Sequence, residues 1–308
     1  MARPRTVDAG SFGRVTRIVR SPWSRRATSI AVLAISFGAL GWITYANWPA
    51  IVTTEWAPDP GRLIAAFALQ IASAAIATQL WFSIAARLGA TRRTSADIRN
   101  YAYTLLSRRL PGAPWHIVGR SLHYADAGLA RRVGIGGSTI EWALAVATGV
   151  CVWLALAPAT APLGPFGAIF AIVAIPFVGG VIVRQRGGAF SARRAIALWT
   201  AYDLIGWATG CGAMYFLFTG LYPFPNDALL TLVSSTAAAY VASMAVVILP
   251  AGLGLREVSL AALTATLVPW PVAVALSIVG RALTMVADLV WATILLVSAL
   301  RSADESTQ

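Results

Sequence analysis

Residues 272–300 read VAVALSIVGRALTMVADLVWATILLVSAL, and this stretch indicates the class of protein. About 20 mostly apolar residues are enough for a helix to cross the hydrocarbon core of a bilayer. Two ionisable residues, Arg281 and Asp288, lie inside the stretch at a spacing that places them on one helical face. An ionisable side chain at that depth costs about 2.5–3.5 kcal/mol, so each one needs a structural or functional reason.

The composition of the whole chain agrees with a membrane protein. Of its 308 residues, 58% are hydrophobic and only 12% are charged, which is about half the proportion in an average soluble domain. The mean hydropathy is +0.70. A soluble protein of this length would leave too much apolar surface in water. The composition therefore excludes an ordinary soluble enzyme and predicts one all-α membrane domain.

Hydropathy predicts a polytopic integral membrane helical bundle of about eight spans, of which the seventh is short and irregular. Residues 1–26 are then a basic N-terminal tail, residues 27–300 the transmembrane domain and residues 301–308 a short C-terminal tail. The predicted spans cover residues 27–48, 63–86, 140–157, 163–183, 195–219, 228–249, 258–268 and 272–300.

The arginines predict the orientation of these spans. All 24 basic residues are arginines, and the formal net charge is +12. Most of them cluster in residues 1–26, 87–99 and 184–194 and at Arg301, whereas the alternate loops carry few charges. By the positive-inside rule we expect a multi-pass protein of the cell (inner or cytoplasmic) membrane with both termini in the cytoplasm and Trp270 outside. Arginine clusters between apolar stretches argue against nucleic acid as a partner.

The segment between the second and third predicted spans is too polar to cross a membrane and too apolar for an ordinary loop. Thr94, followed three residues later by Asp97, predicts the start of a helix whose apolar residues recur at helical spacing. We expect an amphipathic helix at the cytoplasmic interface that ends at the L-P-G sequence of residues 110–112. A second short helix follows, with Trp115 on one side.

A similar interruption lies at residues 249–257, LPAGLGLRE, in the second half of the chain. Paired interrupted segments indicate a binding site in transporters, because lipid cannot satisfy the backbone groups that a broken helix frees. The N-terminus of such a helix favours an anionic group such as phosphate. A pair of ordinary helix kinks is the alternative.

Charged residues inside the predicted spans and breaks are the candidates for a site. We expect Arg281 to face inward and to meet an acid, either Glu257 or Glu141. A structural ion pair between helices, with no ligand, is the alternative. The candidates are Glu141, Asp203, Arg256, Glu257, Arg281 and Asp288.

Soluble catalytic chemistry finds little support in the sequence. His116 and His123 are too widely spaced for a metal site without further ligands, so neither a metal nor another cofactor is expected. Cys151 and Cys211 lie in apolar segments, where cysteine is usually a small buried hydrophobe. No nucleophile-elbow, P-loop or zinc-protease motif occurs, and we expect no enzyme activity.

The two breaks together carry a resemblance to a known family. RRLPGAPWHIVGR at residues 108–120, Glu141, ILPAGLGLRE at residues 248–257 and Arg281 resemble the lysylphosphatidylglycerol synthase transmembrane (flippase-like) family over roughly residues 27–300. The resemblance implies a bundle with two broken or re-entrant elements and a role in lipid handling. By position, the family's motif residues fall on Pro111, Gly112, Trp115, Arg120, Glu141, Pro250, Gly252, Gly254, Glu257 and Arg281.

Three departures from the family pattern concern the substrate. Arg109 stands where an aromatic residue is frequent, Ala251 replaces a frequent glycine, and no soluble synthase domain accompanies these segments. The resemblance therefore implies the lipid-translocating part alone.

The resulting expectation is a flippase-like protein that moves an anionic phospholipid or a polyprenyl-phosphate-linked lipid between leaflets. Arg120, Arg256 or Arg281 and the helix N-termini would bind the phosphate, and Glu141 and Glu257 would position those arginines. Asp288 joins this set because it shares a helical face with Arg281. The alternative is an accessory membrane subunit for glycosyl- or aminoacyl-lipid synthesis, with a lipid-modifying enzyme as partner and no transport activity of its own.

Overall fold

The described residues of the computed structural model form helices joined by short loops. The model describes residue 38 and residues 41–90, 93–108, 115–129, 132–157, 188–245 and 254–305, and each regular element there is a helix. The all-α prediction is thus confirmed for this part of the chain. After a helical segment over residues 41–52 come α3 (Pro60–Leu88), α4 (Ser95–Ser107), α5 (Trp115–Asp126), α6 (Arg132–Leu156), α8 (Gly188–Thr219), α9 (Ala228–Ala245), α10 (Leu255–Thr264) and α11 (Trp270–Glu305).

Three helices are long and apolar enough to cross a membrane. They are Pro60–Leu88 in α3, Val133–Leu156 in α6 and Trp270–Ser302 in α11, and they contain most of the second, third and last predicted spans. The shorter apolar helix Ala228–Met244 lies in α9. These helices fit a helical membrane protein. The fourth predicted span, residues 163–183, lies outside the described residues.

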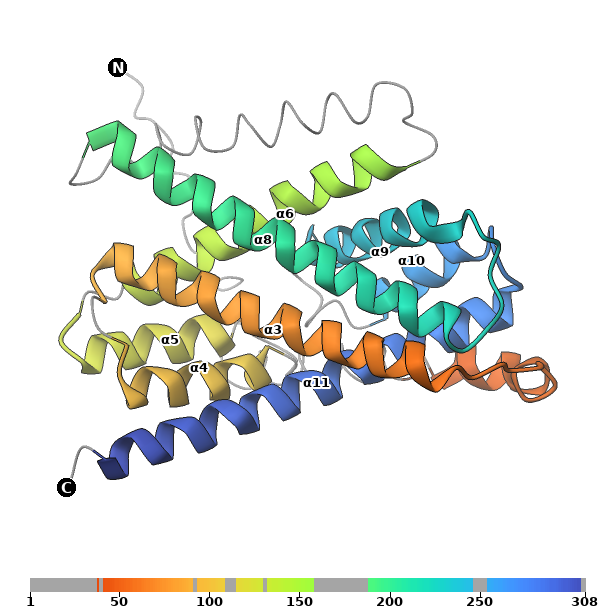
Figure 1. The fold of residues 1–308 in the computed structure, drawn as a ribbon, viewed down its shortest axis with the longest axis horizontal. Coiled ribbons are helices and arrows are strands. Elements are labelled where there is room, and N and C mark those ends of the chain that lie inside the picture. Colours follow the sequence, from red (N-terminus) through yellow and green to blue (C-terminus); the bar gives the residue numbers. More distant parts are fainter. Residues whose placement is uncertain are drawn as a thin grey trace, which may run out of the picture.

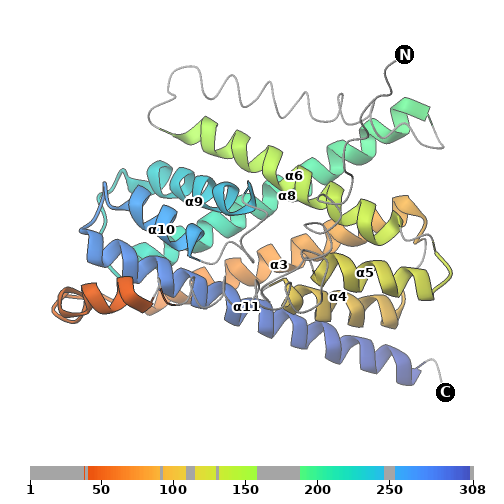
Figure 2. The same cartoon turned by 180° about the vertical axis from the view of Figure 1, so that it is seen from behind.

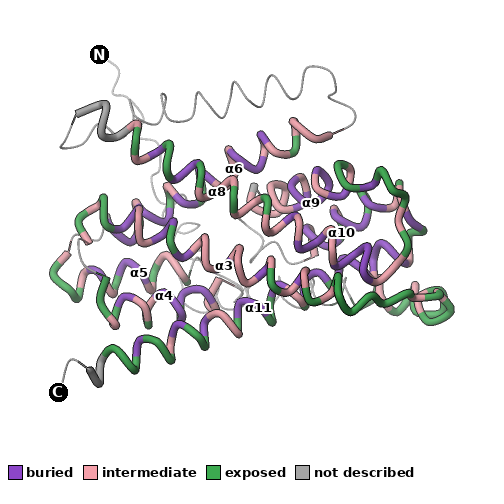
Figure 3. Tube along the Cα trace, viewed as in Figure 1, coloured by how far each residue is buried: buried purple, intermediate pink, exposed green. Residues whose placement is uncertain are grey.

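The outer faces of the long helices carry large apolar side chains. Ile64 of α3 is 70% exposed, and Leu289 and Leu300 of α11 are 55% and 57% exposed. In Figure 3 the buried residues of α3 and α11 alternate with exposed ones along each helix. Exposed apolar surface of this extent needs a lipid or protein cover. The burial pattern therefore agrees with an apolar surrounding.

α3 and α8 form the most extensive helix–helix interface and run side by side across the molecule (Figure 1). Gly206 and Gly210 of α8 lie on this interface, where the Ser73 hydroxyl of α3 donates to the Gly206 carbonyl at 3.2 Å. Small residues at a four-residue spacing let two helix backbones approach closely in a membrane. This pair of helices forms the frame for the remaining elements.

The described loops gather at two opposite ends of the bundle (Figures 1 and 2). At one end, the Ala57 amide donates to the Leu221 carbonyl at 3.0 Å and the Asp59 amide donates to the Gly220 carbonyl at 2.8 Å. The loop between α10 and α11 lies at the same end, while the end of α3, the start of α8 and the end of α11 lie at the other. The weakly charged loops that the structure describes thus share one end.

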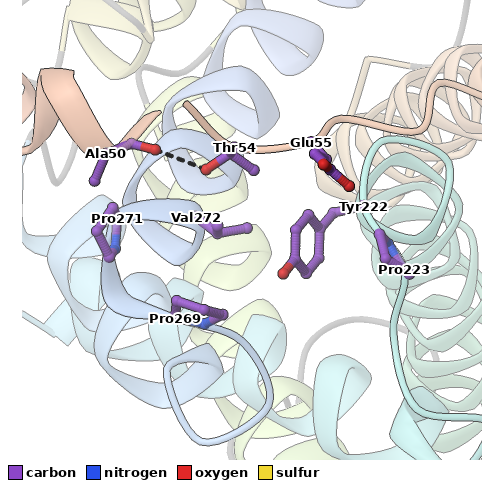
Figure 4. A pocket seen from close by; sticks show the side chains of 8 residues that line it. All are labelled: Ala50, Thr54, Glu55, Tyr222, Pro223, Pro269, Pro271 and Val272. Carbon is purple, nitrogen blue, oxygen red and sulfur yellow. Dashed lines mark hydrogen bonds between the residues drawn. The ribbon is translucent and has the colours of Figure 1, made fainter. Parts of the chain in front are cut away.

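A cavity of about 270 Å³ marks the first of these ends (Figure 4). Three loops far apart in the sequence contribute to its wall, which shows that they meet in space. Its lining residues are Ala50, Thr54, Glu55, Tyr222, Pro223, Pro269, Pro271 and Val272.

α4–α5 and α9–α10 are two helical hairpins that enter the bundle from opposite ends (Figure 1). α4 begins beside the end of α3, and α5 leads back to α6 at that same end. α9 instead begins at the end with the cavity, and α10 finishes at that same end. At 1.5 Å per residue, α10 reaches only about 15 Å inward, so its N-terminus lies inside the bundle. Both hairpins pack against α11.

α4 differs from its predicted position at the membrane interface. Its capping box is present as predicted, since the Thr94 amide donates to Asp97 Oδ2 at 2.8 Å and the Asp97 amide donates to Thr94 Oγ1 at 3.1 Å. However, Tyr101 and Leu105 are buried among side chains of α3, α5 and α11, so α4 is inserted in the bundle. Its apolar stripe predicted a buried face, but periodicity does not tell whether lipid or protein covers that face.

The close approach of α5 to α6 depends on one glycine and gives a first test. A Cβ at Gly134 would lie 2.4 Å from the backbone nitrogen of Ser121, whereas a Cβ at Gly136 would meet nothing within 4 Å. Gly134→Ala is therefore expected to destabilise the protein by about 1–3 kcal/mol through overpacking. Melting curves in mild detergent measure this, with Gly136→Ala as the matched control. Equal melting temperatures for the two variants would contradict the described α5–α6 packing.

Candidate functional site

The carboxylate of Glu141 in α6 binds two arginines. Arg120 Nη1 of α5 lies 2.5 Å from Oε2, and Arg108 Nη2 at the end of α4 lies 2.9 Å from Oε1. Arg120 is fully buried and Glu141 is 6% exposed. Charge-assisted hydrogen bonds of this kind are the strong ones in a protein interior. Glu141 thereby joins the α4–α5 hairpin to the long helix α6.

Aromatic rings enclose the guanidinium of Arg120. Its central carbon lies 3.6 Å from the ring centroid of Trp81 in α3 and 5.1 Å from that of Tyr101 in α4. Its Nε lies 3.4 Å from the hydroxyl of Thr104. Cation–π contacts are strongest when the cation is removed from water. Arg120 therefore connects four helices in what we call the first cluster: Arg108, Arg120, Glu141, Trp81 and Tyr101.

His123 and Asp97 add a second polar connection between α4 and α5. His123 Nε2 lies 2.8 Å from Asp97 Oδ1, near the end of the hairpin that faces out of the bundle. Burial acts to raise the pKa of Asp97, but hydrogen bonds from Thr94 and His123 and the charge of His123 together lower it below its ordinary value. The carboxylate form of Asp97 thus serves both the helix cap and the hairpin.

The N-terminus of α10 organises the second cluster: Gly254, Arg256, Glu257, Arg281 and Tyr240. Gly254 has a φ of 83°, in the left-handed region that favours glycine. Its amide donates to Glu257 Oε2 at 2.9 Å. Glu257 Oε1 lies 3.6 Å from Arg281 Nη1 of α11. The prediction that Arg281 meets Glu257 or Glu141 is confirmed for Glu257, because Glu141 binds the other two arginines instead.

Arg256 is the most unusual residue of the second cluster. It is only 3% exposed, and its guanidinium lies 3.8 Å from the ring centroid of Tyr240 in α9. Within the described part of the chain, neither Nη1 nor Nη2 has a hydrogen-bond partner. A buried guanidinium without an acceptor is costly unless an anion or water supplies one.

α11 connects the two clusters along one face. Arg281 contacts Glu257, while Asp288, 4% exposed, acts electrostatically on Arg108 of the first cluster. The two positions are about 10 Å apart along the helix at 1.5 Å per residue. The predicted shared face of Arg281 and Asp288 therefore lies inward and runs from one hairpin to the other.

The structure brings most of the predicted site residues together, in two groups. Arg120 and Glu141 lie in the first cluster, and Gly254, Arg256, Glu257 and Arg281 lie in the second. Trp115 belongs to neither, because it is 48% exposed on the outer face of α5. Pro111, Gly112, Pro250, Ala251 and Gly252 lie outside the described residues, as does Arg109.

Sequence reasoning missed two important partners. Arg108 was not among the candidate site residues, but it lies against Glu141. Tyr240 is an ordinary aromatic residue of an apolar helix, and no motif marks it as the neighbour of Arg256. The only available signal for Arg108 was that it stands two residues before the L-P-G sequence of residues 110–112.

The chain matches no protein-family model, no curated protein and no solved structure. The geometry of the two clusters is therefore the basis for a functional proposal.

The first cluster predicts unequal losses of stability for substitutions of Glu141 and of Arg108. Glu141→Gln removes the carboxylate that both arginines contact, and breaking a buried pair in this way costs about 3–5 kcal/mol. Arg108→Gln is milder, because Glu141 keeps Arg120 and the Arg108 side chain is 33% exposed. Detergent melting curves should show a much larger loss for Glu141→Gln. A larger loss for Arg108→Gln would show that Glu141 does not hold the hairpin.

Proposed function

We propose that the protein is a flippase-like, multi-pass protein of the cell membrane that moves an anionic lipid between leaflets, with the lipid phosphate bound at the second cluster. Arg256 carries the proposal. The residue is buried, and its Nη1 and Nη2 lack a hydrogen-bond acceptor within the described residues. A phosphate group supplies several acceptors and the balancing charge, and arginine binds it through two parallel hydrogen bonds.

The surroundings of Arg256 favour an anion over a cation. Arg256 lies in the first turn of α10, where the helix dipole places partial positive charge. Arg281 adds a second guanidinium, while Glu257 is the carboxylate in contact with it. The described residues of the second cluster thus carry two positive charges and one negative charge. A bound phosphate removes this excess.

The first cluster also has two arginines and one carboxylate, but there the carboxylate contacts both guanidinium groups. Arg108 and Arg120 face the carboxylate of Glu141, and Asp288 acts on Arg108 from α11. Of the arginines considered for phosphate binding, Arg120 is therefore the least suited, because Glu141 and two aromatic rings already enclose it. Its role in the proposal is to hold the α4–α5 hairpin in the bundle.

The arrangement of the hairpins supports movement between leaflets. Two hairpins that enter from opposite ends and meet one long helix resemble the paired broken elements of transporters. The outward side chains Trp115, Val118 and Leu122 of α5 are 42–51% exposed and suit contact with acyl chains. A lipid whose tail stays in the bilayer needs a polar path only for its headgroup. The motif resemblance to the lysylphosphatidylglycerol synthase transmembrane family points to the same lipid-handling role.

Lipid movement can be tested with Arg256→Gln in proteoliposomes that contain fluorescent phosphatidylglycerol. The variant is expected to lose lipid movement while its detergent melting temperature stays unchanged or rises, because a buried charge without an acceptor is removed. Arg99→Gln, at an exposed arginine of α4, is the matched control and should retain movement. Full movement by Arg256→Gln would remove this residue from the mechanism. Binding of phosphatidylglycerol without movement by the wild type would favour the accessory-subunit alternative.

The proposed orientation predicts which introduced cysteines a membrane-impermeant reagent reaches. A cysteine at position 270, the first residue of α11, should react from outside the cell. A cysteine at position 302 should react only after permeabilisation. Native Cys151 and Cys211 are buried, so the background labelling is low. The reverse pattern would overturn the orientation but not the fold.

A further inference from the structure

Asp203 is a partly buried acid that the proposed function leaves unused. It lies near the middle of α8, about 23 Å from either end at 1.5 Å per residue. Its Oδ2 is hydrogen-bonded to the hydroxyl of Thr148, which lies within the candidate membrane span of α6. The described residues provide no ion-pair partner for Asp203 within salt-bridge distance. An acid at such depth is a functional candidate.

The hydroxyl of Thr148 has several hydrogen-bonding neighbours but only one hydrogen to donate. It lies 3.0 Å from Trp207 Nε1, which only donates, and 2.9 Å from the Leu144 carbonyl, which only accepts. Asp203 Oδ2 is its third neighbour. If the single hydrogen of Thr148 points to Leu144, Asp203 must be protonated and must donate to Thr148. If that hydrogen points to Asp203, the acid is a carboxylate.

The same atoms thus accommodate both protonation states of Asp203 without moving a helix. Gaining a proton from water converts the carboxylate into a carboxylic acid, and the Thr148 hydrogen turns from Asp203 to Leu144. Trp207 donates to Thr148 in both states. This exchange requires only rotation of a hydroxyl group.

A chain of contacts joins this group to the second cluster. The ring centroids of Trp207 and Tyr240 are 6.0 Å apart in an edge-on arrangement, and Arg256 lies 3.8 Å over Tyr240. Trp207 has little freedom, because even a Cβ at Gly149 would lie 2.5 Å from its ring. Asp203 and Arg256 are therefore connected through a tightly packed path from α8 through α6 and α9 to α10.

Few other ionisable groups act on Asp203. Glu141 and Arg108 act on it electrostatically, but they bind each other in the first cluster. α9 contributes Tyr240, and α11 contributes Arg281 and Asp288. The ionisable residues of α3 are Arg62 and Arg87, which lie at its two ends.

We propose that Asp203 is a protonation site coupled to occupancy of the anion site at Arg256. The coupling part of this inference rests on the proposed function. A carboxylate at Asp203 and a phosphate at Arg256 repel each other, so anion binding favours protonated Asp203. By linkage, anion binding takes up protons, and a lower pH strengthens anion binding. Lipid movement would then respond to a proton gradient across the membrane.

Infrared spectroscopy tests the protonation site without any lipid transport. The C=O stretching band of a protonated carboxyl group should titrate in the wild type and disappear in Asp203→Asn. Asp227→Asn, at an exposed acid in the loop before α9, is the matched control and should keep the band. Thr148→Val should shift the titration, and Thr148→Ser should restore it. An unchanged band in Asp203→Asn would overturn the site.

Proton uptake tests the coupling. Short-chain phosphatidylglycerol is added to the protein in weak buffer, and a pH indicator or calorimetry in two buffers reports protons taken up on binding. The wild type should take up protons, Asp203→Asn should bind without uptake, and Arg256→Gln should do neither. Unchanged uptake by Asp203→Asn would overturn the coupling. If the wild type binds no phosphatidylglycerol, the proposed function and the coupling both fail, while the infrared band decides the protonation site separately.

Discussion

The carboxylate of Glu141 is the contact on which the first half of the bundle depends. An apolar interior gives no force that draws α4 and α5 inward at a defined depth, because lipid is as apolar as the helix faces. Glu141 provides that force by binding Arg108 and Arg120, one from each helix of the hairpin. Gly134 removes the steric obstacle, since α5 passes where a Cβ would be. Charge and close backbone approach therefore act together.

The α9–α10 hairpin differs from the α4–α5 hairpin in how its charged side chains are paired. In the first cluster both arginines bind Glu141, but around α10 the described residues leave Nη1 and Nη2 of Arg256 without an acceptor beside the ring of Tyr240. A protein that needed this region only for stability would gain by replacing Arg256 with an apolar residue. Under the proposed function this charge is a binding group, and Tyr240 is the ring against which it lies.

α11 packs against both hairpins and so joins them in one bundle. Its inward face carries Arg281 beside α10 and Asp288 close to α4, so both clusters meet the same rigid helix. α3 and α8 form the frame on the other side, and Asp203 lies within that frame rather than in either hairpin. A change in charge at Asp203 or Arg256 thus acts on helices that are already packed together, and this is the physical basis for the proposed coupling between them.

The sequence by itself determined that the surrounding is apolar, where several helices form and that one ion pair is made. Apolar length predicted α3, α6 and α11, Thr94 and Asp97 predicted the start of α4, and the cost of a charge in lipid predicted that Arg281 meets an acid such as Glu257. Only the tertiary structure decided that α4 lies inside the bundle, that Arg108 and Arg120 share Glu141, and that Tyr240 and Trp207 connect Arg256 with Asp203. Helical periodicity is local and shows which residues share a face. In a bilayer the outside of a bundle is as apolar as its inside, so the pattern does not show what covers that face, and contacts between distant helices depend on how the helices pack.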